Sequence, residues 1–270
     1  MLFRSKVFAR ALTYARSLGA LVISHPQEPI LSAGAAATSG ALAALKGLPA
    51  VSPMAERMGL DRDIALVEMT GARYHADQIS TARALPSLRR ARDHGFDITA
   101  GTPIHHLTLT DKDADEYRTF FKVKPPLRAE EDRQAVLAAL REGTIDLISS
   151  MHTPQDEESK RLPFEEAASG AVALETLLPA ALGLFHAGDL TLSQLFRAMS
   201  LNPAKRLGLT CGRLSKGAPA DLVLFDPDAA FTLDRTTLRS KSKNTPFDGH
   251  QMRGKVAATF VKGEIVHEAP

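Results

Sequence analysis

A chain of 270 residues and 29.1 kDa is long enough to bury a sizeable core, as one large domain or as one domain with an appendage. The hydrophobic fraction is 44%, and a net charge of +2 with 6% aromatic residues argues against a nucleic-acid partner or a membrane-surface partner. The single cysteine, Cys211, excludes an intrachain disulfide, and no apolar run approaches the roughly 18 residues of a membrane span, so we expect a cytoplasmic protein.

Amphipathic helices alternate with short apolar strands from the N-terminus onward. Apolar residues recur at helical spacing up to Gly19, which favours a helix of the folded protein over a cleaved presequence. The predicted strands are 20–24, 73–79, 97–101 and 144–150. The predicted helices are one that begins near Pro53, 82–94 capped by Ser80-Thr81, 132–142, 170–187, 192–200 and a short one from 202 to 208. This alternation predicts a parallel sheet with crossover helices, either a β/α barrel or a doubly wound sheet.

The pattern changes near Cys211. Segments 220–225, 254–261 and 264–267 have the length of hairpin strands, and turn residues separate them, such as Asp226-Pro227-Asp228. The polar segment 240–244 is the one piece that we expect to be disordered. We therefore predict two parts, an α/β part over residues 1–210 and a small β element over residues 211–270.

Several segments resemble a known family. The tail contains GRLSKGAPADLVLFDPD and GKVAATFVKGEIVHE, which resemble the C-terminal strands of the small β-sandwich in the amidohydrolase superfamily. Further upstream stand YRTFFKVKPPLR and IDLISSMHTPQDEESKRLPFEEAASGAVALETLLP, which resemble the dihydroorotases, as do RYHADQISTA and NTPFDG. The resemblance covers essentially every residue. It implies an α/β fold in which residues 1–210 form part of a TIM-type (β/α) barrel and residues 211–270 half of a small β-sandwich.

The resemblance also implies a chemistry. Dihydroorotases reversibly cyclise N-carbamoyl-aspartate to dihydroorotate, with one or two divalent metals such as zinc that activate a water molecule. An aspartate on the last barrel strand binds metal and shuttles the proton. The family also carries a His-x-His metal pair on its first barrel strand, whereas His105-His106 are adjacent here and in a strand would face opposite sides. We therefore expect the chain to start within the barrel, without the opening strands.

The family's site positions hold a mixture of residues in this chain. His25 follows the strand 20–24 at the position of a metal-binding histidine, and its simpler interpretation is a histidine bonded to the backbone. The next ligand position is Gln78, a poor zinc ligand. The position of the catalytic aspartate is Met151, whose thioether carries no charge and cannot accept the proton. His152 and Gly170 remain as candidate substrate-binding residues.

Three more positions bear on the site. The family asparagine before Pro-Pro-Leu-Arg is Lys124 in this chain. We expect His75 to be a core histidine that faces away from Gln78, because side chains alternate along a strand. Arg128 is expected to shape the end of a loop or to pair with a carboxylate.

Two hypotheses of function follow. The first is a non-catalytic dihydroorotase-like protein of pyrimidine biosynthesis that binds no zinc or other cofactor. As the resemblance implies, it would support aspartate transcarbamoylase, the preceding enzyme of the pathway, as a structural partner. The alternative is an active metal-dependent hydrolase of dihydroorotate or a related cyclic amide, with zinc. A catalytic zinc needs at least three protein ligands, and at most one or two remain, so the sequence favours the first hypothesis. Exposed strand edges also predict a homo- or hetero-oligomer.

Overall fold

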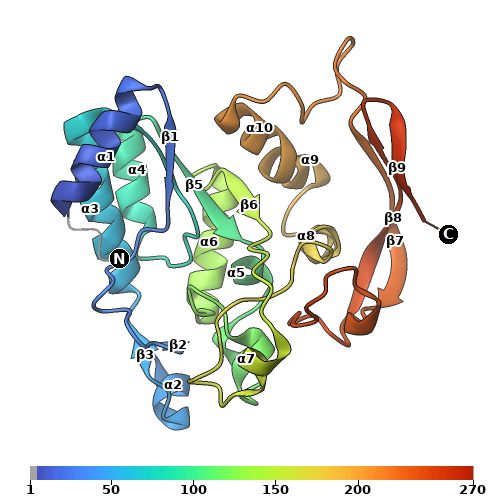
Figure 1. The fold of residues 1–270 in the computed structure, drawn as a ribbon, viewed down its shortest axis with the longest axis horizontal. Helices are drawn as coiled ribbons and strands as arrows, with labels where there is room; N and C mark the ends of the chain where they lie inside the picture. The colour runs from blue at the N-terminus through green and yellow to red at the C-terminus, as the bar shows by residue number, and fades with distance from the viewer. Residues whose placement is uncertain (1–4, 270) are drawn as a thin grey trace.

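The computed structural model describes residues 5–269, which form an α/β part followed by an antiparallel sheet (Figure 1). The α-helices are α1 (Ser5–Ser17), α2 (Ala41–Lys46), α3 (Met54–Thr70), α4 (Leu85–Asp93), α5 (His105–Thr108), α6 (Glu130–Glu142), α7 (Glu157–Arg161), α8 (Leu177–His186), α9 (Leu192–Phe196) and α10 (Asn202–Leu207). The strands are β1 (Leu21–Ser24), β2 (Ala37–Thr38), β3 (Ala50–Val51), β4 (Arg73–Ala76), β5 (Ile98–Pro103), β6 (Leu147–Ser149), β7 (Leu222–Thr232), β8 (Gln251–Val261) and β9 (Glu264–Glu268). Shorter turns are η1 (Asp111–Ala114), η2 (Thr119–Phe121), η4 (Arg235–Thr237) and the π-helical η3 (Arg197–Leu201).

The central sheet has the strand order of a barrel. Its four parallel strands follow the order β1-β4-β5-β6, so each strand pairs with the next one along the chain. A parallel bridge between His152 and Ala171 continues the same progression beyond β6. A doubly wound sheet instead reverses its strand order at a switch point. The (β/α) arrangement is therefore the one that the chain adopts.

Helices cover one side of this sheet and supply most of the core. Leu12 of α1, Leu60 of α3, Leu88 of α4 and Leu137 of α6 are all completely buried in one hydrophobic cluster. Burial of a leucine side chain contributes about 1.5–3 kcal/mol each. Left-handed glycines end two of these helices, and one of them is Gly143 after α6, where the sequence predicts the end. None of the helices in residues 5–269 is long and apolar enough to cross a membrane.

Two predicted helix starts are wrong because tertiary contacts override local signals. Ser80 and Thr81 do not cap α4, which begins at Leu85 after Ala84. Their amides and hydroxyls instead donate to the buried carboxylate of Glu56 on α3. The helix predicted from residue 170 begins only at Leu177, because Ala171 forms a parallel bridge with His152, which lies beyond the end of β6.

The segment between residues 25 and 53 contains structure that the sequence pattern did not predict. The strands β2 and β3 pair in parallel, with Ala37 opposite Ala50, and α2 connects them. Both strands are only two residues long, too short to show an alternating pattern.

The tail forms a three-stranded antiparallel sheet with the order β7-β8-β9. Asp226-Pro227-Asp228, predicted as a turn, lies inside β7, where the pairing register shifts between Asp226 and Ala230. Such a bulge accommodates turn-forming residues without ending the strand. The sheet packs on α8 through Gly254, where an added Cβ would lie 2.3 Å from Cδ1 of Leu182.

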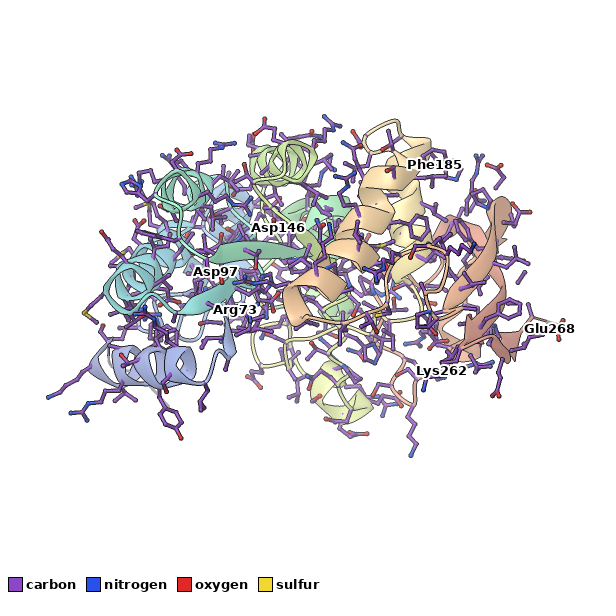
Figure 2. All side chains as sticks on the ribbon, turned by 90° about the horizontal axis from the view of Figure 1, so that it is seen from above. Arg73, Asp97, Asp146, Phe185, Lys262 and Glu268 are labelled. Atoms are coloured by element: carbon purple, nitrogen blue, oxygen red, sulfur yellow. The ribbon has the colours of Figure 1, made fainter. Side chains whose placement is uncertain are left out.

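Ion pairs join α4 and α10 to the parallel sheet. Asp97 at the start of β5 pairs with Arg73 at 3.2 Å and with Arg206 of α10. Asp146, before β6, pairs with Arg92 of α4. Figure 2 shows Arg73, Asp97 and Asp146 together on the parallel sheet, away from Glu268 on the tail.

Candidate functional site

A cavity of about 280 Å³ lies where the four parallel strands end at their carboxyl side. Each strand contributes a lining residue: His25 follows β1, Gln78 follows β4, Pro103 ends β5 and Met151 follows β6. The carboxyl ends of parallel strands meet at one edge, which is where β/α barrels place their functional sites. The positions that the sequence analysis singled out at three strand ends therefore converge on one cavity.

The backbone at two of these positions is unusual. Gln78 has a φ of 64° and Met151 a φ of 48°, both in the left-handed region. Residues other than glycine rarely adopt this conformation, and those that do cluster at functional sites. The geometry supports a functional position at both strand ends, although neither side chain carries a charge.

His25 lines the cavity as a neutral side chain. Burial lowers its pKa to about 4, helped by the positive charges of Lys124 and Arg128. Its Nε2 is buried and has no hydrogen-bond partner. The simpler interpretation of a histidine satisfied by the backbone therefore does not account for Nε2, and His25 as a metal ligand stays a prediction.

Two histidines that the sequence analysis set aside also line the cavity. His105 and His106 begin the short helix α5, so both can face one side, whereas in a strand they would have faced opposite sides. Both are buried, and burial lowers the pKa of His105 to about 4 and that of His106 to about 3. The sequence signal that could have identified them is the pair of adjacent histidines shortly after the strand β5.

The ring nitrogens of this pair differ in role. Nε2 of His106 donates to the carbonyl of Pro126 at 3.2 Å, so Nδ1 of the neutral ring carries a lone pair. This Nδ1 and Nε2 of His105 are buried without a partner. The ring of His105 stacks on Phe247 from the tail, with 5.8 Å between ring centroids. The tail thus holds one of the cavity's histidines in place.

Gly170 forms part of the cavity wall and has to be a glycine. Its φ is 142°, and an added Cβ would lie 2.5 Å from the carbonyl oxygen of Thr153. Its amide donates to Lys122, and its carbonyl accepts from Nδ2 of Asn244 at 3.0 Å. Asn244 is buried and bonded, so the expectation of disorder is wrong at this residue.

The remaining candidate histidines lie outside the cavity lining. Nδ1 of His152 accepts hydrogen bonds from the amides of Ala173 and Leu174, both at 3.2 Å, which orients the loop after Gly170. A role of His152 in substrate binding stays a prediction. His75 is buried, and its Nδ1 lies 2.8 Å from the Thr99 hydroxyl on the neighbouring strand, as expected for a core histidine.

The donor groups of the cavity do not fit the metal that the resemblance implies. Its lining in the described chain contains no aspartate or glutamate, and Lys124 is its charged side chain. Nowhere in residues 5–269 do three or more His, Cys, Asp or Glu side chains lie in an arrangement that could hold a metal ion. A zinc site needs at least three such ligands, and a dication beside an ammonium group is repelled.

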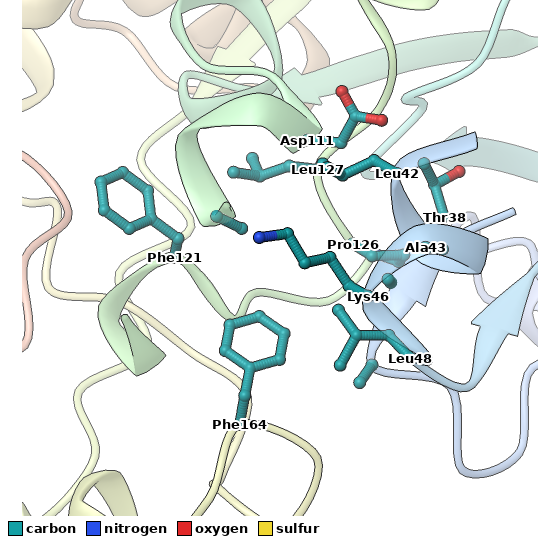
Figure 3. A pocket seen from close by; sticks show the side chains of 13 residues that line it. Thr38, Leu42, Ala43, Lys46, Leu48, Asp111, Phe121, Pro126, Leu127 and Phe164 are labelled. Carbon is teal, nitrogen blue, oxygen red and sulfur yellow. The ribbon is translucent and has the colours of Figure 1, made fainter. Parts of the chain in front are cut away.

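A second, smaller cavity lies against α2 and is too small for a ligand. Figure 3 shows the Lys46 side chain reaching between Phe121 and Phe164. The space measures about 30 Å³, far below the range of ligand pockets, roughly 300–1,000 Å³. Lys46 forms an ion pair with Asp115 at 2.6 Å, so its ammonium group is already neutralised.

Comparison with known proteins identifies the family. Residues 60–266 match the profile of the amidohydrolase family. The chain belongs to the amidohydrolase family. It is 42% identical over 264 residues to a dihydroorotase of Syntrophus aciditrophicus, and 41% identical over 266 residues to one of Anaeromyxobacter dehalogenans. Each alignment covers 98% of this chain, which spans 62% and 61% of the length of those two relatives.

Solved structures place this amidohydrolase chain in the same fold. L-hydantoinase (dihydropyrimidinase) from Arthrobacter aurescens superposes with a TM-score of 0.90 at 26% identity, over 99% of this chain and 61% of that one. A dihydropyrimidinase from Brevibacillus agri gives 0.86 at 24% identity, over 98% of this chain and 60% of that one. The predicted fold class and the resemblance to dihydroorotases are both confirmed.

Proposed function

We propose that this amidohydrolase chain is a dihydroorotase-like protein of pyrimidine biosynthesis that does not catalyse the metal-dependent reaction and has a structural role. The chemistry of the cavity carries this proposal. Gln78 and Met151 stand at strand ends where the resemblance implies a metal ligand and the catalytic aspartate. Lys124 adds a positive charge where the family has an asparagine.

Gln78 and Met151 remove two separate requirements of the hydrolysis, a metal ligand and the general base. A positioned general base contributes about 10²–10⁴-fold to such a rate, and a thioether cannot take its place. In residues 5–269 no three such ligands are arranged to hold a metal, and this supports the loss of the Lewis acid that polarises the carbonyl. The alternative hypothesis, an active dihydroorotase, needs a base and ligands of another kind.

The direct test is an assay of the purified chain with dihydroorotate and with N-carbamoyl-aspartate, in the presence of added zinc. We expect a rate equal to that without protein, and no stoichiometric zinc by metal analysis of protein purified without chelator. The dihydroorotase of Syntrophus aciditrophicus, assayed in parallel, is the positive control. Turnover that a chelator abolishes and zinc restores would establish the active alternative.

We further propose that the structural role is exercised in the cytoplasm, on aspartate transcarbamoylase or through self-association. The resemblance supports the choice of partner. The exposed edge of the sheet supports association, because Ile23 on the edge strand β1 and Tyr14 and Leu18 near it are more than half exposed. Light scattering of the chain, alone and mixed with aspartate transcarbamoylase, should give a mass above that of the monomer. A monodisperse monomer that is indifferent to the transcarbamoylase contradicts the proposed role.

A further inference from the structure

A separate cavity of about 500 Å³ is lined by α7 and by the segment of the tail from 235 to 244. Phe120 of η2 and Gln155, just before α7, form further parts of its wall. None of the described residues that line it also lines the cavity at the strand ends. Its volume lies within the range of ligand pockets, roughly 300–1,000 Å³. The described chain therefore has a second cavity with room for a small molecule.

Positive side chains outnumber carboxylates in this wall, and we call it the basic cavity. Its described lining contains two carboxylates, Asp156 and Glu157, and five cationic side chains: Lys160, Arg161, Arg235, Lys241 and Lys243. The carboxylates have other partners. Asp156 caps α7 by accepting from the Ser159 amide at 2.8 Å, and Glu157 pairs with Arg161 at 2.7 Å. Neither carboxylate is therefore paired with a lysine of the basic cavity.

The three lysines keep their positive charge without a counter-charge. Lys241 is exposed and makes no ion pair or hydrogen bond among the described residues. Lys243 donates to the carbonyl of Leu238, and Lys160 donates to three backbone carbonyls. A carbonyl accepts a hydrogen bond but carries no net charge, so the ammonium charges are not balanced. A hollow lined by charges of one sign concentrates their field and attracts ions of the opposite sign.

An arginine and an aromatic ring form another side of the basic cavity. The guanidinium of Arg235 lies over the ring of Phe120, 5.2 Å from its centroid, and that of Arg118 lies 5.0 Å from the same centroid. Asp248 pairs with both, at 2.7 Å from Arg118 and 3.6 Å from Arg235. One carboxylate between two guanidinium groups leaves a positive charge beside an apolar surface. This side suits an anion that carries a carbon group.

We infer that the basic cavity binds a small phosphomonoester. A phosphate group carries about −1.5 to −2 charges at pH 7 and three acceptor oxygens, so it can engage several ammonium groups at once. Lys241 and Lys243 provide the counter-charge, and the Ser242 hydroxyl, which has no partner among the described residues, donates a further hydrogen bond. The carbon part of the ester packs against Phe120. This inference goes beyond the proposed function and does not depend on the loss of the metal chemistry.

The test is a ligand-observed NMR titration of the full chain with glycerol phosphate, in a buffer free of phosphate. We expect saturable binding with one site per chain, weaker binding of inorganic phosphate, which lacks the carbon part, and no binding of glycerol. The affinity for glycerol phosphate should fall as sodium chloride is added, because salt screens the attraction. Lys241→Met keeps the aliphatic length and removes the charge, and should weaken binding about tenfold, the effect of one lost hydrogen bond between charged groups.

Lys216→Met is the matched control. Lys216 is also exposed, and it lies on a loop outside the basic cavity, so this variant loses the same charge and should keep the affinity of the unmodified chain. Equal affinities of Lys241→Met and Lys216→Met overturn the site. Inorganic phosphate bound as tightly as glycerol phosphate overturns the assignment to an ester, and binding of glycerol overturns the role of the charge. Turnover of dihydroorotate bears on the proposed function alone, whatever the result with glycerol phosphate.

Discussion

Replacing Glu56 with alanine should lower the free energy of unfolding by about 3–5 kcal/mol, the usual effect of removing one partner of a buried ion pair. The carboxylate of Glu56 is 1% exposed and accepts hydrogen bonds from the amides and hydroxyls of Ser80 and Thr81. Arg128, also fully buried, lies 3.7 Å from it and donates to the hydroxyls of Ser80 and Thr38. The substitution would leave four hydrogen-bond donors in the core without an acceptor and the Arg128 guanidinium without a counter-charge.

Urea denaturation of the unmodified chain and of Glu56→Ala measures this loss in the free energy of unfolding. Glu68→Ala is the matched control, because Glu68 lies on the same helix α3 and is exposed, and it should change stability by less than about 0.5 kcal/mol. Adding Arg128→Met to Glu56→Ala should recover part of the loss, since the second change removes the stranded charge. Equal urea midpoints for Glu56→Ala and Glu68→Ala would show that the hydrogen bonds and the ion pair of Glu56 contribute nothing to stability.

Acidification from pH 6.5 to about 4 should unfold the protein, because its buried histidines stay neutral when folded. Burial lowers the pKa of His105 to about 4 and that of His106 to about 3, against an unfolded value near 6.5. Below pH 6.5 the unfolded chain binds protons that the folded chain does not, so stability is lost as pH falls. The slope from each histidine is about 0.7 kcal/mol per pH unit at pH 6.5 and approaches about 1.4 kcal/mol per pH unit near pH 5, where the unfolded histidine is fully protonated.

Chemical denaturation at several pH values between 7 and 5 gives the slope directly. His106→Gln removes one titrating group and retains an amide that can donate to the Pro126 carbonyl. Comparison of this variant with the unmodified chain cancels the titration of all other groups, and the slope of the variant should be lower by an amount that approaches about 1.4 kcal/mol per pH unit near pH 5. Identical slopes for the two proteins would mean that His106 has the same pKa in the folded and the unfolded chain.

Much of the barrel could be predicted because its signals are local. The strands β1, β4, β5 and β6 were recognised as apolar runs that alternate with amphipathic helices, and their ends lie within a few residues of those predicted. Parallel strands share one carboxyl edge, so His25, Gln78 and Met151 could be expected to meet once the strands were known. Those predictions depend on periodicity and topology, which a single sequence displays.

Other parts depend on partners that are distant in the sequence. Ser80 and Thr81 have the composition of a helix cap, and only the buried carboxylate of Glu56 diverts them from that role. His105 and His106 share a cavity because α5 is a helix, and its four residues are too few to show a helical period. For Arg128 the sequence left two roles open, shaping the end of a loop or pairing with a carboxylate, and its partner Glu56 on α3 could not be identified by spacing.

The contact between Asn244 and Gly170 has a practical consequence for fragments of this chain. Asn244 belongs to the tail in sequence, yet it bonds to Gly170 and to the amide of Gln155 beside the cavity. Phe247, three residues further, stacks on His105. A fragment cut at residue 210 therefore lacks the side chain that bonds to Gly170 in the cavity wall and leaves His105 without its aromatic neighbour. Fragments of the two parts would have to be co-expressed and reassembled to restore these two contacts with the cavity residues.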